Sequence, residues 1–222
     1  MPIEAVIFDM DGLMLDTEPF YRAAWQRAAR ECGYEISDEL WFDFVGRTRA
    51  GGEDLMVQLF GAGFPLEAFR AASLRTEKAV FAEAVPSKKP GLDRLLGFLD
   101  LRGLPCAVAT STDRNRATEH LSSHRLLDRF NVMATGDEVE HGKPAPDLFL
   151  LAAGRLAVAP TNCLVLEDSE AGVLAAHHAG MRIFIVPDLR LPSAAIEQMS
   201  QGTFDSLFAV EDELRRLFTP RP

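Results

Sequence analysis

The sequence predicts an α/β protein, in which a parallel sheet is flanked by helices and a smaller helical domain is inserted near the start of the chain. Three observations support this fold class. An apolar segment at residues 3–8 predicts a first strand, residues 16–87 follow a helical pattern, and strands alternate with helices from residue 91 onward. Such alternation is typical of parallel sheets, because parallel strands are usually joined by a helix.

A helical domain follows the first strand. Pro19 suits the first turn of a helix that Gly33 can end. Residues 37–84 remain helical in pattern, and Pro86 and Pro90 mark a linker that returns to the sheet. We therefore expect residues 16–87 to form an inserted helical domain, and residues 1–15 and 88–222 to form the α/β core.

The core segment is predicted to supply the remaining strands of the sheet. Continuous apolar runs at residues 164–166 and 183–186 are typical of strands that are covered on both faces. Residues 193–218 give weaker helical signals. The predicted strands are 105–110, 131–134, 163–167 and 182–186, and the predicted helices lie near 91–102, 114–123, 146–157 and 169–179.

The composition indicates a globular enzyme rather than a partner of polyanions. Of the 222 residues, 47% are hydrophobic and 25% are charged, which argues against extensive disorder. A formal net charge of -10 would repel a nucleic-acid backbone or an anionic membrane. We find neither a basic leader followed by an apolar run nor a segment that could span a bilayer. We therefore expect a cytoplasmic protein, monomeric, with no nucleic-acid or membrane partner.

Two carboxylates directly follow the first strand. Side chains alternate along a strand, so Asp9 and Asp11 point the same way, and Gly12 allows the backbone to turn. Two such charges held roughly 4 Å apart repel by about 4 kcal/mol at an effective dielectric of about 20, which favours a bound cation or a shared proton. Taken alone, such a pair is more often a solvated turn after a strand than part of a site.

Other polar residues follow the later strands. Thr110 and Ser111 end one strand, Lys143 lies in a loop, and Glu167 and Asp168 end another strand. Ligands of open parallel sheets bind at this edge. Phosphoryl transfer needs a nucleophile, a magnesium site, hydrogen-bond donors and a proton donor, and each has a candidate here. Each residue alone could be an ordinary strand-end hydroxyl, a solvated lysine or a helix cap, but their joint occurrence favours an active site.

Four motifs resemble the signatures of the haloacid dehalogenase superfamily. They are Asp9-Met10-Asp11-Gly12, Ala107-Val108-Ala109-Thr110-Ser111, Gly142-Lys143-Pro144 and Leu166-Glu167-Asp168-Ser169-Glu170-Ala171-Gly172, in the order the family uses. The resemblance covers essentially the whole chain. It implies a Rossmann-like core with a helical cap inserted after the first motif, as in the subgroup of β-phosphoglucomutase and many small phosphatases. The segments 140–144 and 180–188 are most similar to pseudouridine 5′-phosphatase and related sugar-phosphate phosphatases.

The resemblance also implies chemical roles for the two N-terminal acids. Asp9 would attack phosphorus and become an aspartyl phosphate. Asp11 would protonate the leaving oxygen and later take a proton from water. The implied cofactor is Mg²⁺, with Asp9, Asp168, Glu167 and the backbone carbonyl of Asp11 as the expected ligands.

The remaining implied roles concern the binding of the phosphorylated substrate. Thr110, with Ser111 beside it, would donate hydrogen bonds to the phosphoryl group, and the ammonium of Lys143 would offset its charge. In the cap, Arg49 matches the arginine that capped relatives direct to the substrate, although a surface role for it is equally compatible with the sequence. The expected partner is a small phosphorylated metabolite.

Three functions remain open. The favoured one is a Mg²⁺-dependent phosphatase that acts on a sugar phosphate or a nucleoside monophosphate such as pseudouridine 5′-phosphate. A β-phosphoglucomutase-like phosphosugar mutase is the alternative, but Tyr21 occupies the position of a histidine in that mutase. A phosphoaspartate signalling module is disfavoured, because receiver domains place paired acids before the phosphoacceptor and are about half as long.

Overall fold

The computed structural model describes residues 2–45 and 47–219. The chain divides into two compact units. Residues up to Leu15 together with those from Lys88 onward form the first unit, and Asp16–Ser87 form the second. We call them the sheet unit and the helical unit and describe each by itself.

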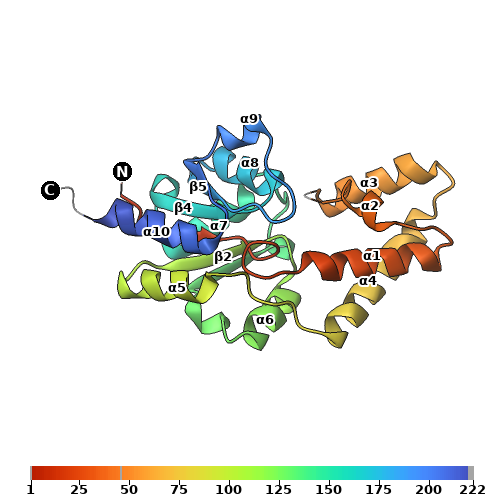
Figure 1. Ribbon diagram of the computed structural model, residues 1–222, viewed down its shortest axis with the longest axis horizontal. Coiled ribbons are helices and arrows are strands. Elements are labelled where there is room, and N and C mark those ends of the chain that lie inside the picture. The colour runs from red at the N-terminus through yellow and green to blue at the C-terminus, as the bar shows by residue number, and fades with distance from the viewer. Residues whose placement is uncertain (1, 46, 220–222) are drawn as a thin grey trace. The chain divides into compact units, whose positions relative to one another are not determined.

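The sheet unit is built on a sheet of six parallel strands, and Figure 1 labels β2, β4 and β5. Their order across the sheet is β3-β2-β1-β4-β5-β6. The parallel α/β fold predicted from the sequence is therefore confirmed. The strands are β1 (Ala5–Phe8), β2 (Cys106–Thr110), β3 (Val132–Thr135), β4 (Cys163–Glu167), β5 (Arg182–Ile185) and β6 (Gly202–Thr203).

The short edge strand β6 lies in the tail for which only helical signals were predicted. It pairs with β5 through Ile185 and Thr203. Two residues are too few to give a periodic pattern, so tertiary pairing rather than local sequence determines this strand. The rest of the tail is partly helical, as expected, in α9 (Ala194–Glu197) and α10 (Leu207–Phe218).

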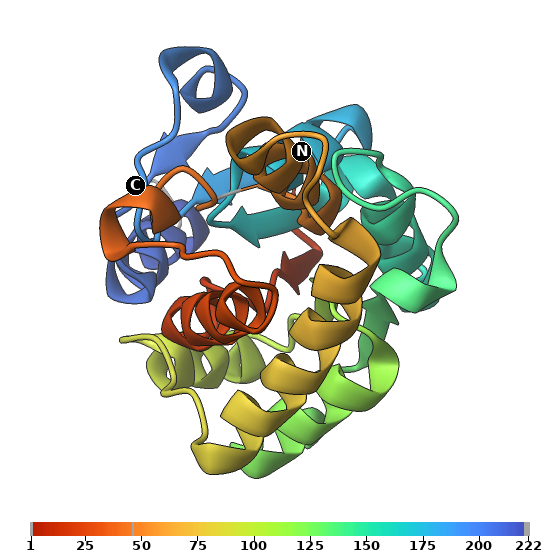
Figure 2. The same cartoon turned by 90° about the vertical axis from the view of Figure 1, so that its right-hand side faces the viewer.

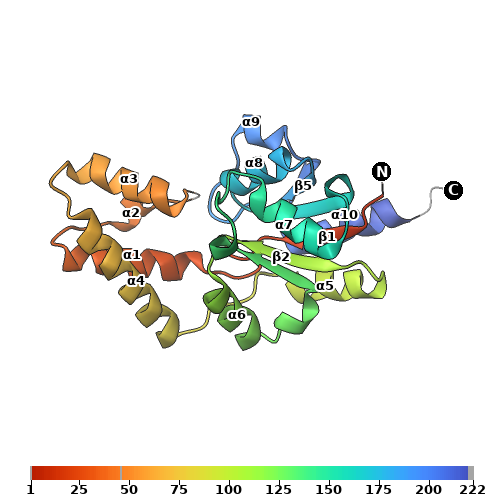
Figure 3. The same cartoon turned by 180° about the vertical axis from the view of Figure 1, so that it is seen from behind.

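Helices cover both faces of the sheet. Figure 3 shows α7 lying over the strands on one side, and α5 and α10 belong to the opposite layer. α8 packs with α7 in the same layer. The remaining bounds are α5 (Leu92–Leu101), α6 (Arg114–Ser123), α7 (Asp147–Leu156) and α8 (Glu170–His178), with 3₁₀ turns η1 (Leu127–Arg129), η2 (Gly136–Glu138) and η3 (Pro160–Asn162).

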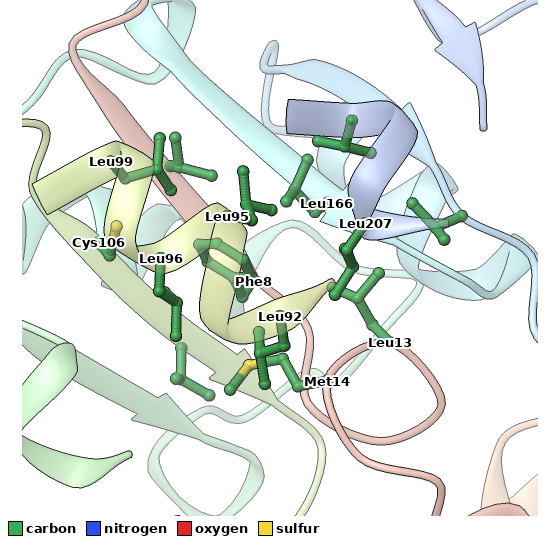
Figure 4. Close-up of a cluster of buried hydrophobic side chains, with 14 of the residues drawn as sticks. Phe8, Leu13, Met14, Leu92, Leu95, Leu96, Leu99, Cys106, Leu166 and Leu207 are labelled. Carbon is green, nitrogen blue, oxygen red and sulfur yellow. The ribbon is translucent and has the colours of Figure 1, made fainter. Parts of the chain in front are cut away.

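Alternation along β1 divides the core into two layers. Val6 and Phe8 face the cluster formed with α5 and α10, whereas Ala5 and Ile7 face the cluster formed with α7 and α8. Figure 4 shows Phe8 packed among leucines of α5, with Leu166 and Leu207 nearby. Because both faces of the sheet are buried, β1 is apolar at every position.

The helical unit contains no strand within its described residues 16–45 and 47–87. Figure 2 shows α1 in red beside the long α4 in gold. Its core is aromatic: Trp25 makes edge contacts with Trp41, Phe44 and Phe69. The helices are α1 (Glu18–Glu31), α2 (Asp38–Trp41), α3 (Arg49–Phe60) and α4 (Leu66–Glu83).

The strand order determines where polar side chains meet. β1 lies between β2 and β4, so the carboxyl ends of these three strands are neighbours although they are far apart in sequence. In doubly wound sheets of this order, ligands bind at this edge. Among residues 2–45 and 47–219, no helix combines the length and apolar character that crossing a bilayer requires.

Candidate active site

Asp9 and Lys143 form a buried ion pair at the carboxyl end of β1. The backbone N–H of Asp9 donates to the carbonyl of Leu166 on β4 at 3.0 Å, which fixes the residue at the sheet edge. The ammonium of Lys143 donates to Oδ1 of Asp9. Asp9 is 6% exposed and Lys143 is 9% exposed. The lysine also lies over the ring of Phe149, 4.9 Å from its centroid, so its charge is held by both a carboxylate and an aromatic face.

Glu167, at the end of β4, is the second partner of this lysine. Its Oε1 accepts from Nζ of Lys143 at 2.6 Å. Its Oε2 accepts from the backbone N–H groups of Asp168 and Ser169, both at 2.8 Å, and from the Ser169 hydroxyl at 3.0 Å. These donors lie at the start of α8, where a negative charge is stabilised.

A glycine makes room for that buried carboxylate. A Cβ at Gly172 would collide with the carboxyl group of Glu167. A glycine is therefore required at position 172 because the carboxyl group of Glu167 lies against it, and not because of its backbone conformation. Glu167 is fully buried. Its carboxylate is held by Lys143 and by the donors at the start of α8.

Asp168 completes a cluster of three carboxylates. Asp9, Glu167 and Asp168 each offer an oxygen, and these oxygens lie within 4.8 Å of one another. We call these three residues the acidic cluster. Gly12 packs directly against it, since a Cβ there would collide with Oδ2 of Asp168 and lie 3.4 Å from Oδ2 of Asp188. Gly12 also has φ +85°, so a glycine is required on two counts.

The acidic cluster carries more negative charge than Lys143 can neutralise. Burial raises the pKa of Asp9 to about 8; Lys143 opposes this shift, and the charges of Glu167 and Asp11 add to it. Burial, together with Glu167 and Asp9, raises the pKa of Asp168 well above its usual value. For Lys143, burial would lower the pKa, but the carboxylates of Asp9 and Glu167 outweigh it and the pKa is raised. A further cation would relieve this excess.

The chemistry of the cluster fits a hard divalent cation such as Mg²⁺. Such ions prefer carboxylate oxygens, water and phosphate oxygens, and the three residues offer only oxygen ligands. Glu167 already uses Oε2 for three hydrogen bonds and Oε1 for Lys143. Asp9 and Asp168 are therefore the less committed ligands, and Glu167 has a second task in holding Lys143.

Asp11 lies beside this cluster but has different partners. Its Oδ2 accepts from the hydroxyl of Thr110 at 3.1 Å and from the hydroxyl of Thr112 at 2.7 Å. Thr110 ends β2 and is fully buried, whereas Ser111 is exposed. The structure thus brings Asp9, Asp11, Thr110, Lys143, Glu167 and Asp168 to the same sheet edge, as β1, β2 and β4 are neighbours.

Arg49 lies in the helical unit, at the start of α3. Its guanidinium donates to Oε1 of Glu77 at 2.6 Å, and that carboxylate is fully buried. The arginine side chain is 43% exposed, and the hydrogen bond to the buried Glu77 orients its guanidinium.

Sequence reasoning missed two features of this edge. The first is the role of Thr112, which follows the same strand as Thr110 and Ser111 but was given no role, although alternation from Thr110 indicates that both hydroxyls point the same way. The second is the ion pair between Lys89 and Asp188, at 2.5 Å, which lies next to Gly12 and Asp168. No local pattern could have revealed it, because its two residues are 99 positions apart.

Comparisons with known proteins agree with this geometry. A family model described as haloacid dehalogenase-like hydrolase matches residues 3–180. The phosphorylated carbohydrates phosphatase of Thermotoga maritima is 37% identical over 197 residues, which are 88% of this chain and 91% of the relative. A Drosophila melanogaster protein proposed to be a pseudouridine-5′-phosphatase is 35% identical over 201 residues, 88% of this chain and 86% of its own.

A solved structure also matches this chain over nearly its whole length. The crystal structure of a proposed β-phosphoglucomutase from Thermotoga maritima has a TM-score of 0.77 and 33% identity, and covers 97% of this chain and 100% of its own. The chain belongs to the haloacid dehalogenase-like hydrolase family. The resemblance predicted from the four motifs is therefore confirmed.

Proposed function

We propose that the protein is a phosphatase that hydrolyses a small phosphomonoester through an aspartyl phosphate on Asp9. The observation that carries the proposal is the acidic cluster around Asp9 with Lys143 at its centre. Lys143 stabilises the ionised form of Asp9, and only the ionised carboxylate is a nucleophile. The names of the relatives favour a phosphorylated carbohydrate or a nucleoside phosphate as substrate.

In the first half-reaction, a carboxylate oxygen of Asp9 bonds to phosphorus while the bond from phosphorus to the leaving oxygen breaks. Asp11 gives its proton to that leaving oxygen, so an alcohol departs. Lys143 offsets the negative charge on Asp9 and the transferring group, and Thr110 and Ser111 are the proposed hydrogen-bond donors to the phosphoryl oxygens. The product is an acyl phosphate on Asp9.

In the second half-reaction, water attacks phosphorus and Asp11 takes its proton. The bond between phosphorus and the Asp9 oxygen breaks, which releases phosphate and restores the carboxylate. Asp9 and Asp168, with Glu167, would hold Mg²⁺, which when bound supplies positive charge to the phosphoryl oxygens. The backbone carbonyl of Asp11 is a further proposed ligand.

The helical unit is proposed to act as the cap that selects the leaving group. Arg49, held in one direction by Glu77, is its proposed contact with the part of the substrate beyond the phosphoryl group. We also propose that the enzyme works as a cytoplasmic monomer on a free metabolite, since its net charge of -10 disfavours polyanionic partners.

The test is a substrate panel with wild type and Asp9→Asn in the presence of Mg²⁺. The panel contains glycerol phosphates, hexose phosphates, nucleotides and pseudouridine 5′-phosphate, and phosphate release is measured. We expect release from at least one of them, and a loss of about 10⁴-fold or more in Asp9→Asn, as for other covalent nucleophiles. Asp128→Asn, at an exposed position in η1, is the matched control and should retain full activity.

Two outcomes would contradict the proposal. Interconversion of hexose phosphates without phosphate release would instead identify a mutase, the function proposed for the solved Thermotoga structure. A stable phosphorylated Asp9 that does not turn over would identify a signalling module.

A further inference from the structure

Two threonines donate to the same oxygen of Asp11. The hydroxyl of Thr112 lies 2.7 Å from Oδ2, and the hydroxyl of Thr110 lies 3.1 Å from it. The backbone N–H of Thr112 donates to the Thr110 hydroxyl oxygen at 3.1 Å. A hydroxyl has one proton to donate. While Thr110 donates to an ionised Asp11, it cannot also donate to a phosphoryl oxygen.

The backbone of Thr112 is held from two sides. Its carbonyl accepts from the N–H of Gly136 at 3.2 Å, and the next residue, Asp113, caps α6 by accepting from the N–H of Arg116 at 3.0 Å. A Cβ at Gly136 would collide with the carbonyl of Ser111, so the two loops are in close contact. A donor on a backbone held in this way needs little reorganisation to keep its partner in place.

We propose that Thr112 is the positioning residue for Asp11, which holds this acid in place when Thr110 turns its hydroxyl to the transferring phosphoryl group. This inference rests on the proposed phosphatase function. Thr112 transfers no proton itself. Its hydroxyl donates to Oδ2 and so fixes the orientation of the carboxyl group that, in the proposed reaction, exchanges a proton with the leaving group.

The kinetic test compares two kinds of leaving group in Thr112→Val, which keeps the side-chain shape but lacks the hydroxyl. Glycerol phosphate needs a proton on its departing alkoxide, whereas p-nitrophenyl phosphate loses a stabilised phenolate. General acid catalysis contributes about 10²–10⁴-fold. We expect kcat/KM for glycerol phosphate to fall about 10- to 100-fold, and kcat/KM for p-nitrophenyl phosphate to fall less than about 3-fold.

Two further variants separate positioning from folding. Thr112→Ser retains the hydroxyl and should restore kcat/KM to within about 3-fold of wild type. Thr118→Val removes a hydroxyl that donates to the carbonyl of Arg114 at 2.7 Å, within α6, and should affect neither substrate. Equal losses for both substrates in Thr112→Val, or no rescue by Thr112→Ser, would overturn the inference.

Crystal structures of Thr110→Val and Thr112→Val provide a readout that does not depend on activity. We expect Asp11 to keep its side-chain conformation in Thr110→Val, where the shorter hydrogen bond remains, and to leave it in Thr112→Val. An unmoved Asp11 in Thr112→Val would overturn the positioning role even in an active enzyme. Absence of phosphate release by the wild type from every substrate would instead refute the proposed function, and this inference with it.

Discussion

Two charged clusters of the sheet unit have opposite imbalances of charge. At the ends of β1 and β4, Lys143 is shared between the carboxylates of Asp9 and Glu167, and Asp168 adds a third. After β3, a single carboxylate, Glu138, is shared between Arg114 at 2.5 Å and Arg155 at 2.9 Å. In the acidic cluster the carboxylates outnumber the contacting ammonium of Lys143, whereas at Glu138 two guanidinium groups contact one carboxylate.

The pKa shifts follow from this difference. Burial and neighbouring carboxylates raise the pKa of Asp9 to about 8, whereas hydrogen bonds from Arg155 and Arg114 hold the pKa of Glu138 well below its ordinary value. A buried excess of charge lowers stability, because its desolvation is not repaid by the available partner. Such an arrangement is typical of functional sites, whereas a neutralised cluster is typical of structural ones.

The largest expected effect comes from removing the only ammonium that the acidic cluster contacts among the described residues. In Lys143→Met, Asp9 and Glu167 lose their shared partner, and leaving a buried charge uncompensated costs about 3–5 kcal/mol. We expect urea unfolding at pH 8 without Mg²⁺ to show a loss of that size. Phosphatase activity should fall by at least about 10³-fold, because an electrostatic partner of the transferring group is lost.

Lys78→Met is the control for this experiment. Lys78 is exposed on α4, and its replacement should change stability by less than about 0.5 kcal/mol. If Lys143→Met were as stable as wild type, the acidic cluster would not depend on its lysine, and the contrast with Glu138 would disappear.

The second expected effect is stabilisation of the acidic cluster by Mg²⁺. A ligand that binds only the folded state stabilises it by about 2.7 kcal/mol at 100 times its Kd. For a chain of this size, about 1 kcal/mol raises the Tm by about 2–4 °C, so a rise of about 5–10 °C is expected. The measurement is thermal unfolding at increasing Mg²⁺ concentrations.

Two variants make this measurement specific. Asp168→Asn removes one proposed ligand and should abolish most of the rise in Tm. Glu138→Gln changes the neutralised cluster and should leave the rise intact. An equal rise in both variants would place the cation elsewhere and refute the assignment of this site.

Parts of the active-site edge of the sheet could be predicted from the sequence, because their residues lie at the ends of recognisable strands. Asp9, Thr110 and Glu167 each end or directly follow an apolar strand, and the order of a parallel sheet brings such positions together. The family and the fold were predicted from the same segments and are confirmed. The roles of the site residues remain predictions.

The features that were missed depend on contacts distant in sequence. Arg114 and Arg155 converge on Glu138 from two helices, and neither spacing nor composition indicates that they meet. The pair formed by Lys89 and Asp188 is hidden for the same reason. The edge strand β6 depends on its pairing with β5 rather than on its own two residues.

The smallest expected effect concerns the pH dependence of the Glu138 cluster. The hydrogen bonds from Arg155 hold the pKa of Glu138 in the folded protein below its ordinary value of 4.5, although partial burial opposes this. The ionised carboxylate therefore contributes stability at pH values above 4.5, and this contribution is lost as the pH falls toward the folded-state pKa. Because its arginines are partly exposed, we expect a contribution of only about 1 kcal/mol.

Comparing wild type with Glu138→Gln isolates the contribution of Glu138 to the free energy of unfolding, because all other carboxylates titrate alike in the two proteins. The difference in their free energies of unfolding should be constant from neutral pH down to mildly acidic conditions, and should narrow below pH 4.5. Urea unfolding at closely spaced pH values measures it. If the difference instead widened on acidification, the folded protein would favour the protonated form of Glu138, and this cluster would resemble that of Asp9 rather than oppose it.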